Sequence, residues 1–277
     1  MRRRHLFEFE DQPWLPTVLR NLQTDFLRQM STTLRLYAPV ASLLERVLTQ
    51  LPARRIVDLC SGAAGPWEQL LASGWPVHVT LTDRYPNQGA LARIKARHQG
   101  CIDYHPAPVD ARCLPEHLDG MRTLFNGFHH FRPEEAREIL RDAVEHRAAI
   151  GIFEIAERTP RTWLAVLIGV PLLIFALTPC LRPLTLARLF WTYGLPLAPL
   201  CILWDGVVSL LRAYSQADLL AMAAAAGGDY HWECGRLEQP FPAVPITYLL
   251  GYPRGSRSPD TTSAPAFRPD QLQQAAE

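Results

Sequence analysis

Three aspartates and two glycines between residues 58 and 110 have the types and spacing of a cofactor site. Asp58 stands ahead of a CSGAAG segment, in which Gly62 and Gly65 let a ligand approach the backbone. A carboxylate in that place suits a cationic amino-acid group better than a pyrophosphate. Asp83 ends the next apolar run, where one carboxylate can accept both hydroxyls of a ribose. Asp110 follows the next predicted crossover, where it could lie near an adenine ring.

Two adjacent histidines are the side chains best suited to acid–base chemistry. His129 and His130 follow a predicted strand, so an imidazole there could remove a proton from a substrate hydroxyl. Alternatively, either histidine packs against or caps the helix that starts beyond Pro133. Glu154, at the end of the following strand, points toward the same edge of the sheet, and an ion pair with Arg158 is its alternative role.

The elements that must position these residues alternate along the chain. Runs typical of strands at 55–59, 77–82, 121–125 and 148–155 alternate with helical patterns at 67–72, 89–97 and 133–146. This alternation predicts a parallel sheet whose ligands gather at the carboxyl ends of the strands. A helix capped by Ser215 and ended by Gly227 then leads to two closing strands at 230–237 and 247–252. Residues 13–51 read as two helices separated by Pro39.

The order of the motifs DLCSGAAG, VTLTD, PVDA and LFNGFHHF, with a helix behind the last, resembles one family. It is similar to the class I S-adenosylmethionine-dependent methyltransferases over about residues 55 to 155. The resemblance implies a doubly wound α/β fold, with a mostly parallel seven-stranded sheet of the Rossmann-like methyltransferase type. The two late strands fit the reversed final hairpin of this family. Ala64 departs from the pattern, because many members have a glycine there.

The resemblance also implies S-adenosylmethionine as the cofactor and gives roles to individual residues. Asp58, Gly62 and Gly65 would line the methionine and its turn, Asp83 would hold the ribose, and Asp110 would lie at the adenine. Residues 125–129 would form the floor beside the transferable methyl group. The implied cofactor-binding set is Asp58, Cys60, Gly62, Gly65, Asp83, Asp110, Ala111, Phe125 and Asn126.

Composition and missing motifs exclude several other classes of function. The net charge is +1, from 28 basic and 27 acidic residues, so the sequence has no excess of basic residues of the kind that favours nucleic-acid binding. The segment FNGF stands where base-modifying N-methyltransferases carry an Asn-Pro-Pro-Tyr type motif, and a GxGxxG fingerprint for a dinucleotide is missing. The six cysteines are scattered, which predicts neither disulfides nor a metal site. Because residues 6–14 are acidic and contain no apolar run of signal-peptide length, we expect a cytoplasmic protein.

Two apolar segments interrupt the α/β pattern and need their own explanation. Residues 163–181 and 189–204 contain no charged residue, and Arg182 and Arg188 lie between them. Three alternatives remain open: a transmembrane hairpin, a hairpin lying in the plane of the membrane surface, or a water-soluble lid over an apolar substrate pocket or a dimer partner. Each of them favours a lipophilic substrate.

The sequence therefore predicts an N-terminal helical cap over 1–52, a methyltransferase-like α/β domain over 53–252 and a disordered tail over 253–277. The apolar insert, 163–204, follows the fifth strand. The predicted function is methyl transfer to an oxygen or nitrogen of a small, lipophilic acceptor, with membrane contact through the insert. The alternative is a non-catalytic, cofactor-binding or membrane-attached scaffold. Candidate substrate contacts are Asp25, Tyr37, Trp204, Asp205, Arg212 and Tyr214.

Overall fold

The computed structural model describes residues 3–72, 74–238 and 244–255. Most of the predicted tail, residues 256–277, lies outside the described residues. Within the described part, the predicted strands and helices of the α/β domain begin and end within about two residues of the observed ones, whereas the N-terminal helices, predicted over 13–51, are shorter and cover Thr17–Thr33 and Val40–Leu48. The one strand that sequence reasoning did not locate is the short β3.

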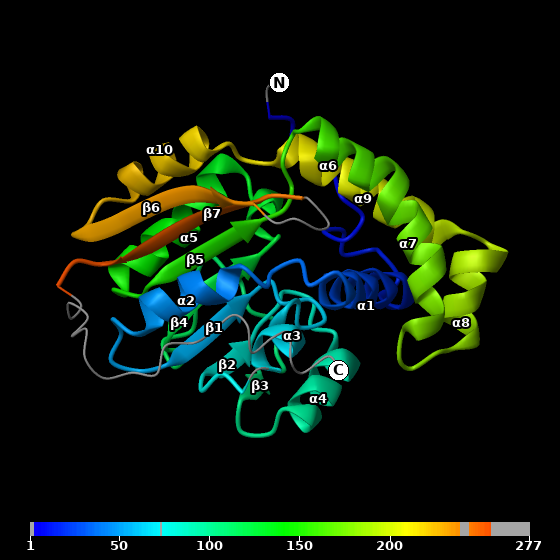
Figure 1. Cartoon of the computed structure of the whole chain (residues 1–277), viewed down its shortest axis with the longest axis horizontal. Coiled ribbons are helices and arrows are strands. Elements are labelled where there is room, and N and C mark those ends of the chain that lie inside the picture. Colours follow the sequence, from blue (N-terminus) through cyan, green and yellow to red (C-terminus); the bar gives the residue numbers. More distant parts are fainter. Residues whose placement is uncertain (1–2, 73, 239–243, 256–277) are drawn as a thin grey trace.

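A seven-stranded sheet forms the centre of the molecule (Figure 1). Its order is β3-β2-β1-β4-β5-β7-β6, in which the first five strands are parallel and β7 pairs antiparallel with β5 and β6. This arrangement confirms the predicted doubly wound sheet with a reversed final hairpin. The strands are β1 (Arg55–Leu59), β2 (His78–Leu81), β3 (Ile102–Tyr104), β4 (Met121–Phe125), β5 (Ile150–Glu154), β6 (Tyr230–Leu237) and β7 (Ile246–Pro253).

Helices cover both faces of the sheet because successive strand residues point to opposite sides. Along β1, Val57 and Leu59 join the core beneath α5 (Pro133–Glu145) and α10 (Gln216–Ala226). Ile56 packs with α2 (Val40–Leu48), α3 (Trp67–Leu71) and α4 (Gln88–Arg97) on the other side. Asp58 points to this second side, so a carboxylate is enclosed where an apolar side chain would normally pack. The carboxyl ends of β1, β2, β4 and β5 meet at the edge that α1 (Thr17–Thr33) covers (Figure 1).

The insert is helical and projects from the sheet beside α1 (Figure 1). Its first rod runs through α6 (Pro160–Leu164), a π-type turn η2 (Ala165–Gly169), α7 (Val170–Leu177) and η3 (Thr178–Cys180). Its return consists of α8 (Leu186–Leu189), η4 (Phe190–Gly194) and the longer α9 (Leu197–Arg212). A buried ion pair between Arg188 of α8 and Asp25 of α1 ties the insert to the N-terminal helix.

Candidate functional site

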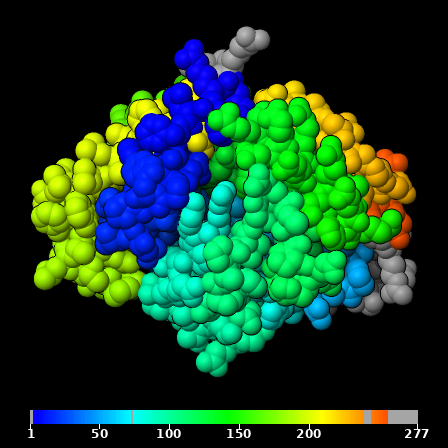
Figure 2. Space-filling model, turned by 180° about the vertical axis from the view of Figure 1, so that it is seen from behind, coloured from blue at the N-terminus to red at the C-terminus, as the bar shows by residue number. Residues whose placement is uncertain are grey.

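A cavity of about 750 Å³ opens at the carboxyl ends of β1, β2 and β4. This volume lies within the usual range for small-molecule sites, about 300–1,000 Å³. The cavity is polar near the glycine turn and apolar beneath the insert, where Val166, Val170, Leu173 and Ile202 line it. The N-terminal segment, residues 5–12, lies across it, and Figure 2 shows these residues in blue between the yellow-green insert and the α/β domain.

The glycine turn after β1 has an unusual backbone. Gly62 and Gly65 have φ angles of +54° and +45°, in the left-handed region that glycine adopts without strain. Ala64, the departure from the family pattern, adopts the same region with φ +82°. Cys60, Gly62 and Gly65 all line the cavity.

Asp58 lies beneath this turn and is not among the residues that line the cavity, so its contact with an amino-acid group stays a prediction. Its carboxylate accepts hydrogen bonds from the Ser61 and Thr123 hydroxyls, each at 2.6 Å. Burial raises the pKa of Asp58 to about 7 although these hydrogen bonds oppose the shift. Asp58 therefore shapes the turn from below.

Asp83 faces the cavity beside the turn. Its Oδ2 accepts the Gly62 N–H at 2.7 Å and its Oδ1 accepts the Tyr85 N–H at 2.7 Å. Each carboxylate oxygen can accept a second hydrogen bond, so both can still receive one ligand hydroxyl. Burial raises the pKa of this carboxyl. The geometry agrees with the predicted ribose contact.

Asp110 and Ala111 do not line the cavity, so the predicted adenine contact by Asp110 is not supported. The Asp110 carboxylate pairs with Arg112 at 2.7 Å, and hydrogen bonding to that guanidinium lowers the pKa of Asp110. Arg112 is the cavity-lining residue of this segment. It stands two positions after Asp110, and sequence reasoning gave it no role.

The floor of the cavity comes from the end of β4. Phe125 stacks with Phe153 and meets the Tyr37 ring edge-on, with ring centroids 5.0 Å apart. Asn126 has a φ of +51°, and its side-chain oxygen accepts the Ile155 N–H at 3.3 Å. Phe125, Asn126 and Tyr37 all line the cavity, as predicted from the sequence.

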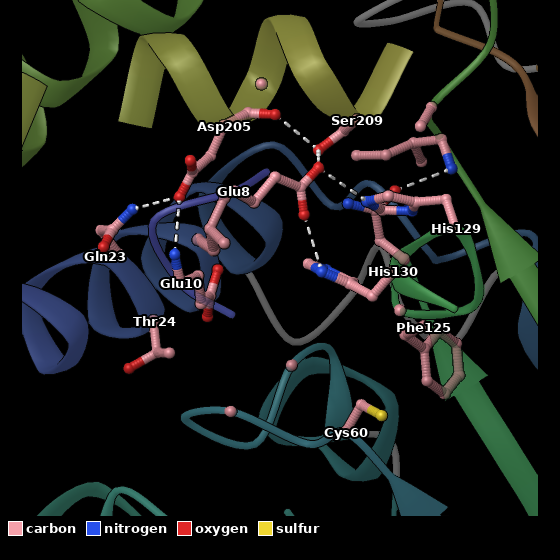
Figure 3. A pocket seen from close by; sticks show the side chains of 18 of the residues that line it. Glu8, Glu10, Gln23, Thr24, Cys60, Phe125, His129, His130, Asp205 and Ser209 are labelled. Atoms are coloured by element: carbon pink, nitrogen blue, oxygen red, sulfur yellow. Dashed lines mark hydrogen bonds and ion pairs between the residues drawn. The ribbon is translucent and has the colours of Figure 1, made fainter. Parts of the chain in front are cut away.

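His129 lines the cavity (Figure 3) and forms a buried pair with Glu154. Nδ1 of His129 lies 2.6 Å from Oε2 of Glu154, while Oε1 accepts the Phe128 N–H at 2.7 Å. Glu154 thus orients this imidazole and is not paired with Arg158, the alternative that the sequence left open. Nε2 of His129 is buried, makes no hydrogen bond within the described residues and lies 3.9 Å from Glu8 Oε1.

Glu8 and Asp11 of the N-terminal segment are functional-site residues that sequence reasoning missed. Glu8 is fully buried and contacts Arg212 at 2.9 Å, Ser209 at 3.0 Å and His130 at 2.7 Å. Asp11 contacts His130 at 2.8 Å and Arg212 at 2.6 Å. Although burial alone would lower it, these two carboxylates raise the pKa of His130 well above its usual value. The only sequence signal was the alternation of acidic and aromatic residues over 7–11.

Glu8, His129 and His130 also place one ligand atom each within 4.8 Å of one another. Such a set is chemically able to hold a transition metal ion. However, Arg212 and His130 already pair with the Glu8 carboxylate. An ion-pair network therefore accounts for the burial of Glu8 without a metal.

Two of the predicted substrate contacts on the last insert helix do line the cavity, namely Asp205 and Arg212. Asp205 accepts the backbone N–H groups of Phe9 at 2.7 Å and Glu10 at 3.1 Å, and the Gln23 side chain at 2.8 Å (Figure 3). Burial raises the pKa of Asp205 to about 6. Both side chains hold the N-terminal segment in place.

Tyr37 also lines the cavity, whereas the remaining three predicted substrate contacts do not. Asp25 is buried in its ion pair with Arg188. Trp204 is on the surface, where Nε1 donates to the Phe7 carbonyl at 3.0 Å. The Tyr214 hydroxyl donates to the Phe131 carbonyl at 2.8 Å. Each of these three side chains has a structural partner of its own, and its role as a substrate contact stays a prediction.

Glu10 adds a further carboxylate to the cavity wall (Figure 3). Burial raises its pKa to about 8, and the neighbouring Asp205 and Asp83 carboxylates add to the shift. The polar end of the cavity therefore concentrates acidic groups, Glu10, Asp83 and Asp205, around a space that a ligand can fill. Such a wall favours a ligand that carries positive charge, because a cation stabilises the ionised form of carboxyls whose pKa is raised by burial.

Searches of protein-family models and of curated protein sequences find no match to this chain. Solved structures do match. The plantazolicin methyltransferase BpumL, in complex with SAH, superposes with a TM-score of 0.53 at 12% identity, over 89% of this chain and 93% of that one. This chain therefore has the class I methyltransferase fold, as the sequence predicted.

Two other matches are longer proteins. One is an O-methyltransferase-like structure from Nostoc punctiforme, with a TM-score of 0.45, 14% identity and 82% of this chain covered. The other is an O-methyltransferase family protein from Burkholderia thailandensis, with a TM-score of 0.44, 17% identity and 80% of this chain covered. The match spans only 59% and 57% of the length of these two structures.

Proposed function

We propose that this chain is an S-adenosylmethionine-dependent methyltransferase that modifies an oxygen or nitrogen of a small, apolar acceptor. The observation that carries the proposal is a single cavity that joins the glycine turn and Asp83 to the His129–Glu154 pair. One end can hold a cofactor, and the other carries a group able to accept a proton.

The residues at the polar end fit this cofactor. Asp83 directs both carboxylate oxygens at a place where ribose hydroxyls can donate. At Gly65 an added Cβ would meet nothing within 4 Å, so the approach to the backbone is open there. The acidic wall of Glu10, Asp83 and Asp205 suits the ammonium and sulfonium charges of the molecule. BpumL, whose structure contains SAH, has the same fold and supports the assignment by analogy.

When bound, S-adenosylmethionine supplies a methyl group on a positively charged sulfur, which a nucleophile can displace. The task of the protein is to align the acceptor and remove its proton. Nε2 of His129 takes the proton from the hydroxyl group of the methyl acceptor. Glu154 accepts a hydrogen bond from Nδ1–H and stabilises the imidazolium that forms. The dyad favours a hydroxyl acceptor, since a neutral amine attacks before it loses its proton.

The acceptor end of the cavity is lined by the inner side of the insert, through residues such as Val166, Val170 and Leu173. An apolar acceptor is the chemistry that this lining favours. We also propose that the protein works in the cytoplasm and contacts a membrane through 163–204. All six cysteines are free, in keeping with a reducing compartment.

The proposal is tested by calorimetric titration of S-adenosylmethionine and S-adenosylhomocysteine into the folded protein, followed by transfer of a labelled methyl group to a panel of apolar hydroxyl compounds. We expect micromolar binding, and transfer that His129→Ala reduces by about 100-fold or more. No binding to the folded chain would overturn the cofactor assignment.

A non-catalytic, cofactor-binding scaffold is the second candidate. It is favoured by one observation, the position of Glu8 over Nε2 of His129. In that case both cofactor forms bind, but no acceptor is methylated, and Glu8→Gln does not change this outcome.

A further inference from the structure

The outer side of the insert exposes large apolar side chains that nothing in the described chain covers. On the first rod, Leu164, Leu167, Ile168, Leu172 and Phe175 recur at three- and four-residue spacing and are 41–65% exposed. On the returning helices of the insert, Leu186 is 84% exposed and Leu200 is 59% exposed. We call this set the docking face. The opposite side of the same rod lines the cavity, so the rod is apolar on both sides.

The length and composition of the rod exclude an ordinary core helix. Pro160–Cys180 has a mean hydropathy of 2.2 over its most apolar window, and only 11% of that window is buried. By length and composition alone it could cross a membrane, and the bent pair Leu186–Gly194 and Leu197–Arg212 could form a broken second span. A soluble core helix of this hydropathy would be mostly enclosed.

Charge around the docking face is of one sign. Between Glu157 and Asp205 the chain has four arginines and no acidic residue. Arg161 and Arg182 are exposed at the two ends of the rod. An apolar face flanked by arginines is complementary to a bilayer surface with anionic headgroups.

We propose that the docking face lies in the plane of an anionic membrane surface and does not span the bilayer. Three contacts hold the insert flat against the domain: the buried Arg188–Asp25 ion pair, the burial of Ile174 and Thr178, and the cavity wall formed by Val170. A hairpin that stood upright in lipid would break the ion pair and open the cavity. The 70° bend before α9 also fits a helix pair that follows a surface.

Aromatic side chains extend the docking face to the N-terminal segment. Trp204 packs against Phe7 with ring centroids 5.3 Å apart, and Trp14 is 63% exposed nearby in the chain. Tryptophan and phenylalanine favour the interfacial layer of a bilayer. Phe7 belongs to the segment that crosses the cavity and Trp14 follows it, so membrane contact and access to the cavity involve the same part of the chain.

The membrane placement adds to the proposed function a route by which the acceptor reaches the cavity. Only this route rests on the proposed function. The insert has lipid on its outer side and the acceptor end of the cavity on its inner side. We infer that the acceptor is a lipid-dissolved molecule that reaches the cavity past the insert. Membrane binding itself does not depend on methyl transfer and is measured separately.

The test is flotation of the full-length protein with sealed vesicles of phosphatidylcholine alone or with about one third phosphatidylglycerol, a composition that supplies the negative surface potential. We expect binding that is stronger on the anionic vesicles. Leu172→Asp and Leu186→Asp should each lower the partition coefficient for vesicle binding about tenfold or more, because each removes a leucine that inserts into the membrane surface. Leu220→Asp, on α10 and 45% exposed in the wild type, is the matched control and should bind normally.

Two outcomes would overturn the proposal. The first is that the wild-type protein binds neither vesicle type and forms dimers that Leu172→Asp dissociates. A second copy of the chain would then cover the docking face.

The second outcome concerns the orientation of the insert. Cys180 is exposed at the end of the rod and should react with an impermeant maleimide outside sealed vesicles, in a Cys113→Ser background. Protection of Cys180 until the vesicles are lysed would indicate a spanning hairpin. Cofactor titration in the same samples shows separately whether the proposed function holds.

Discussion

Asp83→Asn is the substitution that tests the cofactor site most directly. The wild-type carboxylate already accepts the N–H groups of Gly62 and Tyr85, and each oxygen has one further position for a ligand hydroxyl. Asparagine loses one acceptor oxygen and turns an NH₂ group toward a donor. Since a hydrogen bond to a charged group contributes about 1.5–3 kcal/mol, we expect a loss of about 2–3 kcal/mol, or roughly 30- to 150-fold in the dissociation constant of S-adenosylmethionine.

Asp110→Asn is the matched control. It makes the same chemical change at the residue that the family resemblance assigns to the adenine, but its carboxylate pairs with Arg112 outside the cavity. We expect binding within about twofold of wild type, because exposed ion pairs contribute little. Calorimetry on variants whose thermal unfolding matches the wild type is the assay. Equal losses in the two variants, or no loss in Asp83→Asn, would refute the reasoning.

Three further predictions follow from the buried charges. Glu154→Gln removes the carboxylate that orients the imidazole and should lower kcat about 10- to 100-fold in the methyl-transfer assay, with unchanged cofactor affinity. Arg212→Met removes one of the two charged partners of the buried Glu8 carboxylate and should lower the free energy of unfolding in urea by about 3–5 kcal/mol, whereas exposed Arg137→Met should change it by less than about 0.5 kcal/mol. The pKa of His130 is raised in the folded state, so the stability it contributes is complete below pH 6.5 and is lost as pH rises through the folded value. As the pH rises above 6.5, urea unfolding should therefore show a steeper loss of stability in wild type than in His130→Gln.

Local patterns in the sequence determined most of the fold. Ile56 and Val57 point to opposite faces of the sheet because side chains alternate along a strand. The left-handed turn at Gly62 and the end of α10 at Gly227 likewise depend on residue type and on near neighbours in the chain. The position of Asp83 at a strand end was visible for the same reason, since parallel strands bring their carboxyl ends together. The order of the sheet then follows from right-handed crossovers.

Only the tertiary structure decided which polar side chains reach the cavity. Glu8 meets Arg212 across 204 positions of sequence, and Asp25 meets Arg188 across 163, so no local periodicity signals either contact. Asp83 directly follows a predicted strand and lines the cavity, whereas the carboxylate of Asp110 is paired with the arginine two positions away. The free energy of a buried charge depends on its partners and on its burial. Chain folding fixes both, and residue type alone does not.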